Sequence, residues 1–226
     1  MDILFQDRRI VVAVKPSGVL STDEPGGMPA LLRQELHTEC IRTVHRLDAP
    51  VSGLMVFARS AYAAGDLSRQ IREGTFEKHY LAVLRGAPPE REGTLTDLLA
   101  RDKETRLTHV VTTREKGVQE ARLRYRVLDS RAGLALVQIQ LLTGRTHQIR
   151  VQFAHAGWPL LGDTKYGNTT VAGTAGSPAY RGVALCAYSL DFTHPGNGKK
   201  MSFRVKPQNP AFKKFTKIPS EDIFEG

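Results

Sequence analysis

The sequence predicts an α+β fold with a mostly antiparallel sheet, because strand patterns outnumber helical ones and follow one another in runs. The clearest strand spans 120–128 and alternates apolar with basic residues: Ala121, Leu123, Tyr125 and Val127, with Arg122, Arg124 and Arg126 between them. This alternation is typical of a sheet with one solvated face. Residues 134–142 are more continuously apolar and indicate a central strand. Residues 183–193 and 199–205 flank HPGNGK, whose proline, asparagine and glycines predict a hairpin connection.

Helical patterns are fewer. Residues 61–73 have apolar side chains at helical spacing, with Ser60 as the N-cap and Gly74 just past the end. A second helix is predicted over 146–156, and a third, shorter one over 28–39.

Length and composition predict one domain over 1–226. Of the 226 residues, 41% are hydrophobic and 24% charged, which suffices for one sizeable core or at most two small ones. No apolar run is long enough to cross a bilayer. The short apolar stretch at 10–14 lacks the features of a secretory signal and is interpreted as a first strand, so we expect a cytoplasmic protein.

The charge balance favours a polyanionic partner. Lys and Arg number 32 against 23 Asp and Glu, a formal net charge of +9, and the isoelectric point is near 9.8. Such a surplus favours nucleic acid, since each neutralised phosphate releases counterions. A basic protein without such a partner is the alternative that composition leaves open.

Residues 86–118 are predicted to be the least regular stretch. They begin with two prolines and two glycines between 86 and 93, followed by a basic cluster of Arg101, Lys103, Arg106, Arg114 and Lys116. Either a solvated loop or a flexible arm that grips phosphates fits this pattern.

Common catalytic motifs are absent from the sequence. It has neither a GxxxxGK[ST] phosphate loop nor a GxSxG elbow, which disfavours nucleotide hydrolysis and serine-hydrolase chemistry. His37, Cys40 and His45 do not match a zinc spacing and lack a fourth ligand, so they are interpreted as structural. The two cysteines cannot form a disulfide framework.

Asp48 is the candidate for chemistry. It lies in VHRLDAPVSGLMVFARS at 44–60, between two apolar segments, where Pro50 and Gly53 enforce an irregular turn. A carboxylate at such a bend either faces a cleft or caps the turn, and for a lone aspartate capping is the commoner explanation.

Five sequence blocks, spread over roughly 15–195, change the balance between these two explanations of Asp48. They are HRLD followed by SGL at 45–54, KPSG at 15–18, EKHYLA at 77–82, TGRTHQIRV at 143–151, and LGD with YG at 161–167. In type and order they resemble the motifs of RluA-type pseudouridine synthases. KPSG begins almost at the start, so we expect a short form without the separate N-terminal RNA-binding domain that many relatives carry.

The resemblance implies the family's fold, a mixed sheet with flanking helices and loops around a central basic cleft. It also implies isomerisation of uridine to pseudouridine in structured RNA, with neither metal nor organic cofactor. Asp48 matches the nucleophile, which forms its adduct with either the sugar or the base. Arg150 matches a basic partner that would lower the pKa of Asp48. Tyr80 matches a tyrosine that stacks on the uracil and is a candidate for removing the carbon-5 proton.

Further residues are expected on the substrate side. Arg46 matches a residue that fills the space of the extruded nucleotide. The other expected substrate-binding residues are His45, Leu47, Arg145, Ile149 and Arg106, the last within a basic, RNA-gripping loop at roughly 95–118. Ribosomal RNA, transfer RNA or both are the expected partners of a monomer that contacts no membrane.

Two departures from the family pattern stand near the predicted site. Val51 replaces the usual threonine, and Cys186 stands where relatives have the histidine of an LHA motif. The alternatives to catalysis are a non-catalytic RNA-binding or assembly protein and, less favoured, a hydrolase that releases free uracil.

Overall fold

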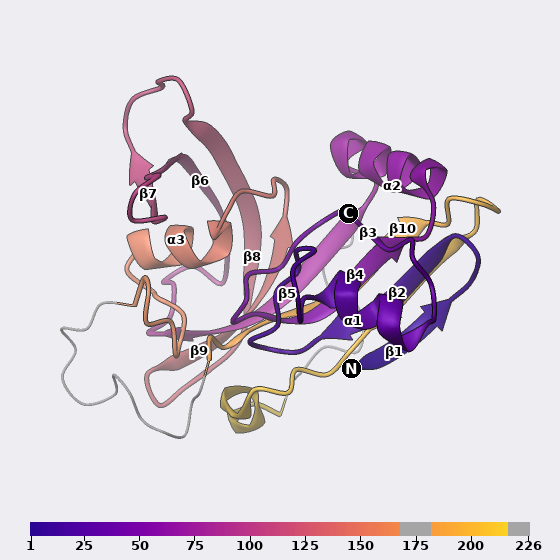
Figure 1. The fold of residues 1–226 in the computed structure, drawn as a ribbon. Coiled ribbons are helices and arrows are strands. Elements are labelled where there is room, and N and C mark those ends of the chain that lie inside the picture. Colours follow the sequence, from indigo (N-terminus) through magenta and orange to yellow (C-terminus); the bar gives the residue numbers. More distant parts are fainter. Residues whose placement is uncertain (168–181, 217–226) are drawn as a thin grey trace. The chain divides into compact units, whose positions relative to one another are not determined.

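The structure, a computed structural model, describes residues 1–167 and 182–216 (Figure 1). The chain divides into two compact units. Unit 1 consists of Met1–His79 and Cys186–Pro207, and unit 2 of Tyr80–Leu185 and Gln208–Gly226. The single domain expected over 1–226 stays a prediction.

Unit 1 is a sheet with two helices. Its neighbouring strands are, in order, β1 (Asp2–Gln6), β2 (Ile10–Lys15), β4 (Ser52–Ala58) and β10 (Leu185–Thr193), with β3 (Arg42–Thr43) beside β4 and β11 (Lys200–Arg204) beside β10. These pairs are antiparallel except β4 with β10, which is parallel. The helices are α1 (Met28–Glu35) and α2 (Ala61–Glu73).

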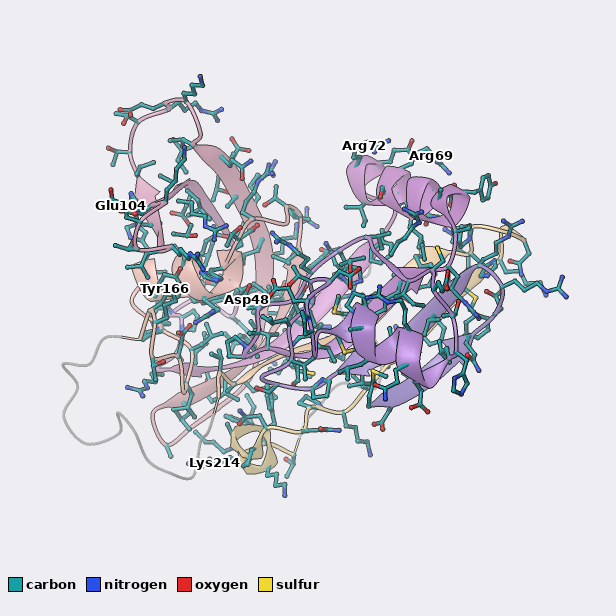
Figure 2. All side chains as sticks on the ribbon, in the orientation of Figure 1. Asp48, Arg69, Arg72, Glu104, Tyr166 and Lys214 are labelled. Atoms are coloured by element: carbon teal, nitrogen blue, oxygen red, sulfur yellow. The ribbon has the colours of Figure 1, made fainter. Side chains whose placement is uncertain are left out.

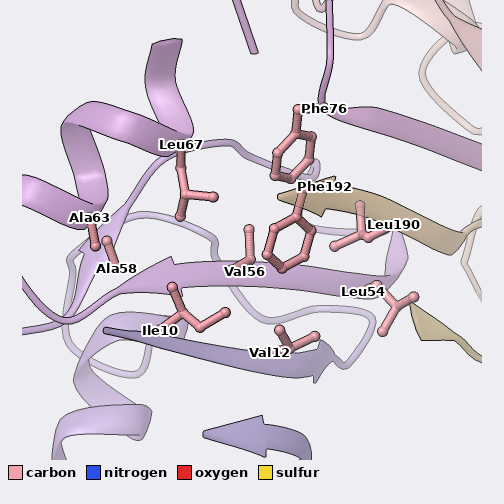
Figure 3. Packing of buried hydrophobic residues seen from close by; sticks show 10 residues of the cluster. All are labelled: Ile10, Val12, Leu54, Val56, Ala58, Ala63, Leu67, Phe76, Leu190 and Phe192. Atoms are coloured by element: carbon pink, nitrogen blue, oxygen red, sulfur yellow. The ribbon is translucent and has the colours of Figure 1, made fainter. Parts of the chain in front are cut away.

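The core of unit 1 lies between α2 and the sheet (Figure 3). Even-numbered residues of β2 and β4 point to the same side and meet Leu67 of α2 and Phe192 of β10. The Phe76 and Phe192 rings stack with centroids 5.4 Å apart. Val11 and Ala13, on the opposite side of β2, are also fully buried, so both faces of this strand are covered.

Unit 2 is built on a second run of strands. Their order is β5 (Glu77–Arg85, which begins in unit 1), β9 (Leu134–Leu141), β8 (Gln119–Arg131), β6 (Glu92–Arg101) and β7 (Thr108–Val111). The β9–β8–β6–β7 pairs are all antiparallel, which confirms the predicted α+β fold with a mostly antiparallel, mixed sheet. The unit also contains α3 (Gln148–His155) and the 3-10 helix η1 (Pro210–Lys214).

The two faces of β8 differ as the sequence predicts. Ala121 and Leu123 are fully buried, and the Tyr125 ring packs edge-on against Phe153 of α3, with centroids 5.7 Å apart. Arg122 and Arg124, on the other face, are exposed.

The helices match their predictions to different degrees. The prediction for 61–73 is confirmed: Ser60 Oγ accepts from the Ala63 amide, and Gly74 adopts φ 73°. The helix predicted over 28–39 ends at Glu35, because His37 takes a left-handed φ of 47°. The helix predicted over 146–156 begins only at Gln148, since His147, at φ 56°, precedes it as the N-cap.

The prediction that 86–118 is the least regular stretch is wrong. β6 and β7 lie in it and pair from Leu98 with Val111 to Arg101 with Thr108. The polar residues of β6 alternate with half-buried ones, so its strand period is weaker than that of β8. The turn between the two strands is closed by the Asp102 carboxylate, which accepts from the Glu104 and Thr105 amides at 2.8 and 2.9 Å.

Candidate active site

The loop that carries Asp48 connects β3 with β4 in unit 1 (Figure 2). Its turn is closed by the Val51 amide, which donates to the Asp48 carbonyl at 3.0 Å. The Asp48 side chain is half-buried between buried Leu47 and Val51. Neighbouring Arg46 is exposed.

A second loop, at 15–21, holds the Asp48 loop in place. Ser21 Oγ accepts from the Leu47 amide at 3.0 Å and donates to the Leu47 carbonyl at 2.7 Å. The Gly18 amide donates to the Ala49 carbonyl at 2.7 Å, and Ser17 Oγ to the Pro50 carbonyl at 2.9 Å. The backbone on both sides of Asp48 is therefore fixed by hydrogen bonds.

Lys15 lies beneath this loop, with its side chain fully buried. Its ammonium group donates to the carbonyls of Pro16, Val19 and Ala49 at 2.9, 2.6 and 3.0 Å. Burial lowers the pKa of Lys15 to about 8, and the negative charge of Asp48 acts in the opposite direction. Lys15 belongs to the KPSG block, from which no function of the lysine was predicted. The sequence signal for a role of Lys15 is its place at the end of an otherwise apolar strand, directly before Pro-Ser-Gly.

His45 has a structural position in unit 1. Its Nε2 accepts from the Val56 amide at 3.1 Å, and its ring lies 5.4 Å from that of Phe76. Burial, with a contribution from the charge of Lys78, lowers the pKa of His45 to about 3, so the ring is neutral. The earlier interpretation of His45 as structural agrees with this geometry. Its contact with substrate stays a prediction, as does that of Leu47.

Arg150 lies on α3 in unit 2 and is buried. Its Nε and Nη2 donate to the two carboxylate oxygens of Asp163 at 2.7 and 2.8 Å. Asp163 also accepts from the amides of Lys165 and Tyr166, and the Arg150 guanidinium lies 5.2 Å from the centre of the Tyr166 ring. The bidentate pair fixes the plane of the guanidinium. Nη1 takes no part in this pair, and the expected interaction of Arg150 with Asp48 stays a prediction.

Asp163 and Tyr166 belong to the LGD and YG blocks, to which the sequence analysis assigned no individual function. The Tyr166 hydroxyl accepts from the Thr108 amide at 3.1 Å and lies 2.6 Å from His147 Nδ1. Tyr166 thereby connects β7, the start of α3 and the Arg150–Asp163 pair. The sequence signal for Asp163 and Tyr166 was their position in the LGD and YG blocks. Their hydrogen-bonding partners lie too far away in sequence to be predicted.

The segment before α3 is attached to β8. Thr143 Oγ1 accepts from the Arg122 amide at 2.8 Å and donates to Gln148 Oε1 at 2.8 Å. Gln148 Nε2 donates to the Arg122 carbonyl at 3.0 Å, and Arg145 Nε to the Glu120 carbonyl at 2.9 Å. Arg145 is therefore anchored through Nε and only partly exposed.

The remaining predicted site residues also lie in unit 2. Tyr80, on β5, and Ile149, on α3, are buried. Arg106 is exposed in the turn between β6 and β7, and its carbonyl accepts from Lys165 at 3.1 Å. The structure thus brings Asp48 together with Arg46, His45 and Leu47 in unit 1, and places the other predicted residues in unit 2.

The two departures from the family pattern are both buried beside β4. Val51 contributes its amide to the Asp48 turn, and this interaction does not require a side-chain hydroxyl. Burial raises the pKa of the Cys186 thiol to about 12, so this side chain is an inert thiol at neutral pH.

Neither a metal cluster nor a membrane span is found among residues 1–167 and 182–216. No three His, Cys, Asp or Glu side chains there are grouped to hold a metal ion. No helix in these ranges has the length and apolar character needed to cross a bilayer.

Comparison with known proteins identifies the family. Residues 9–155 match the family model described as RNA pseudouridylate synthase. The chain is 33% identical over 216 residues to an uncharacterized RNA pseudouridine synthase, YlyB, of Bacillus subtilis, covering 91% of this chain and 68% of the relative. It is 34% identical over 226 residues to ribosomal large subunit pseudouridine synthase D of Neisseria meningitidis serogroup B, covering 94% of this chain and 59% of the relative.

A solved structure shows the same fold. Human RNA pseudouridylate synthase domain containing 4 is similar with a TM-score of 0.74 and 25% identity, over 91% of this chain and 88% of that one. The chain spans about three-fifths to two-thirds of the length of the two bacterial relatives. By the match over 9–155 and by these identities, the chain belongs to the RNA pseudouridylate synthase family.

Proposed function

We propose that this protein isomerises uridine to pseudouridine in structured RNA, with Asp48 as the nucleophile. One observation carries the proposal: Asp48 lies in the family's HRLD block, on a loop whose backbone is hydrogen-bonded on both sides of it. The alternative is a capping role for Asp48, but backbone groups and Ser21 already hold the turn closed.

The proposed reaction needs a nucleophile and proton transfer but no redox partner. The Asp48 carboxylate forms a transient bond to either the ribose anomeric carbon or the base, and the bond between N1 and the ribose breaks. The uracil turns and bonds to the ribose through carbon 5. The carbon-5 proton is then removed and N1 ends protonated, so product and substrate have the same atoms.

Each further residue has a proposed part in this sequence. Tyr80 stacks on the uracil, and its hydroxyl is the candidate base for the carbon-5 proton. Arg150, held in plane by Asp163, supplies positive charge to the Asp48 carboxylate. Arg46, exposed beside Asp48, fills the place of the flipped nucleotide.

The proposed substrate class is ribosomal RNA, transfer RNA or both. The name of the Neisseria relative specifies the large ribosomal subunit, which makes ribosomal RNA the first substrate to test. The net charge of +9 supports a polyanionic partner. A monomer acting in the cytoplasm, where these RNAs function, completes the proposal.

The test of this function is tritium release from RNA that carries [5-³H]uridine. We expect release by the wild type and a loss of at least about 10³-fold in Asp48→Asn, because an amide is a poor nucleophile. Asp23→Asn is the matched control, since Asp23 is an exposed carboxylate paired with Arg33, and it should retain activity.

The outcomes separate the alternatives. A wild-type protein that binds RNA without releasing tritium is a binding or assembly protein, and one that liberates free uracil is a hydrolase. Pseudouridine formed by Asp48→Asn, detected by carbodiimide-dependent primer extension, would refute the assignment of the nucleophile.

A further inference from the structure

The exposed face of β8 contains two guanidinium groups that the proposed mechanism does not use. They belong to Arg122 and Arg124, and within the described part of the chain neither has a carboxylate partner. The charges at the two ends of this row are neutralised. Arg126 pairs with Glu92 at 2.8 Å, and Glu120 pairs with Arg114 at 2.6 Å. The positive charge of this face is therefore concentrated on two adjacent outward positions.

The neighbours of these arginines across the sheet are polar and uncharged. On β6, Thr94 pairs with Arg124 and Thr96 with Arg122, and both threonines are exposed. On β9, Gln140 pairs with Arg124. Hydroxyl and amide groups next to guanidinium groups form hydrogen bonds with phosphate and ribose oxygens without reading a base sequence.

The spacing of the two arginines suits a polynucleotide backbone. Residues two apart on a strand lie about 7 Å apart on the same face, which is comparable to the separation of successive phosphates along one RNA strand. The strand backbone that bears them is held in place, because the neighbouring residues Ala121 and Leu123 are fully buried on the opposite face.

β8 is tied to the segment that leads to Arg150. The Arg122 amide donates to Thr143 Oγ1, and its carbonyl accepts from Gln148 Nε2, two residues before Arg150 on α3. RNA held on this face would therefore be held in a fixed position relative to α3. All of these groups belong to unit 2.

We propose that the Arg122–Arg124 face of β8 binds the sugar-phosphate backbone of the substrate RNA outside the nucleotide that is modified. The proposal rests on the proposed function and adds to it a second, sequence-independent contact surface. It accounts for two exposed charges on a strand whose other ion-pairing side chains have partners.

The test compares two double variants in RNA binding at several salt concentrations. In Arg122→Gln/Arg124→Gln, two phosphate contacts are lost, each contributing about 0.7–0.9 to the slope of log K against log salt. We expect the slope to decrease by about 1.4–1.8, the KM for a long structured RNA to rise, and kcat at saturating RNA to stay at the wild-type value. Glu92→Gln/Arg126→Gln is the matched control, because it removes one charge of each sign from the same face and should leave the slope unchanged.

Three results would overturn the proposal: an unchanged slope in Arg122→Gln/Arg124→Gln, an equal change in the control, or displacement of the RNA by polyglutamate of equal charge as effectively as by unlabelled RNA. The last result would identify a site for an acidic protein. A short RNA that contains only the target loop should be insensitive to both variants. Tritium release by the wild type is scored separately, so the proposed function and the binding surface can fail independently. Circular dichroism melting confirms that both double variants are folded.

Discussion

The ammonium group of Lys15 donates three hydrogen bonds to backbone carbonyls below the loop that carries Asp48. One acceptor is the carbonyl of Ala49, the residue directly after Asp48. Removal of the ammonium group would leave three carbonyls without this donor, which is costly for buried groups. Lys15 thus acts on Asp48 through the backbone as well as through its charge.

The lowered pKa of Lys15 predicts a specific pH dependence of stability. The pKa is about 8 in the folded protein and 10.5 in the unfolded chain, so between these values the unfolded chain binds more protons. Titration of Lys15 therefore raises the free energy of unfolding as the pH rises, by at most about 1 kcal/mol per pH unit. Lys15→Met lacks the gain, and the difference in stability between wild type and variant should widen between pH 8 and 10.

Urea denaturation at pH 7, 8, 9 and 10 measures this difference. Other groups titrate in both proteins and cancel in the comparison. Parallel stability curves for wild type and Lys15→Met would show that Lys15 keeps an ordinary pKa. Below pH 8 the variant should be less stable by about 1–3 kcal/mol, because the carbonyls lose their donor.

At the scale of residues, the sequence indicated which residues to choose better than it indicated the residues that they contact. Asp48 could be chosen because Pro50, Gly53 and the HRLD block surround it. The buried position of Lys15 could not, since a lysine at the end of a strand is exposed unless a loop 34 residues away covers it. Asp163 is a similar case: its pairing with Arg150 depends on how α3 packs, which a local pattern does not report.

Among the structural elements, β4 has a strict packing requirement at its second residue. Gly53, paired with Ala187 of β10, has φ 129°, and a Cβ atom there would lie 2.3 Å from the Ala187 carbonyl oxygen. Only glycine permits both this backbone angle and this approach. β4, the strand after the Asp48 turn, therefore requires a residue without a side chain at position 53.

A pair of glycine substitutions tests this requirement. Gly53→Ala should lower the free energy of unfolding by about 3 kcal/mol or more, because it combines a backbone clash with a disfavoured φ. Gly65→Ala, in the middle of α2 with open space around it, should raise the free energy of unfolding by about 0.5–1 kcal/mol through higher helix propensity. Thermal and urea denaturation measure both, and similar effects of the two substitutions would contradict the packing argument.

Local signals account for the elements that were predicted well. α2 has an N-cap serine, an amphipathic pattern and a left-handed glycine, all within 15 residues, and its bounds follow from these alone. β6 and β7 lack such signals, because Asp97 interrupts the apolar pattern of β6 and β7 has only four residues. They are strands through the pairing of β6 with β7 and with β8. The early end of α1 likewise depends on a non-glycine residue in left-handed conformation, which the sequence does not indicate.

The chain passes between its two units three times, after His79, Leu185 and Pro207, and the first two of these points lie inside strands. β5 begins in unit 1 and ends in unit 2, and β10 begins in unit 2 and continues in unit 1. Since these strands are continuous, fraying of one unit disturbs hydrogen-bonded strands of the other. The fold class could be predicted from strand periodicity, but a division that cuts through two strands leaves no linker in the sequence to mark it.

Unfolding of the whole molecule should consequently be a single cooperative transition. Trp158, the only tryptophan, lies in unit 2, so its fluorescence reports that unit, whereas far-ultraviolet circular dichroism reports both. We expect the two signals to give the same midpoint, and Gly53→Ala in unit 1 to shift the Trp158 midpoint equally. Two separated transitions would show that the units fold independently and would contradict the single domain.

The parallel pairing of β4 with β10 has a consequence for biosynthesis. A ribosome exposes residues 52 and 53 long before their partners, Cys186 and Ala187, leave the exit tunnel. Unit 1, which contains Asp48, is therefore completed only after residues 186 and 187 have been translated. A polypeptide that ends before residue 185 lacks β10 and cannot complete the sheet of unit 1.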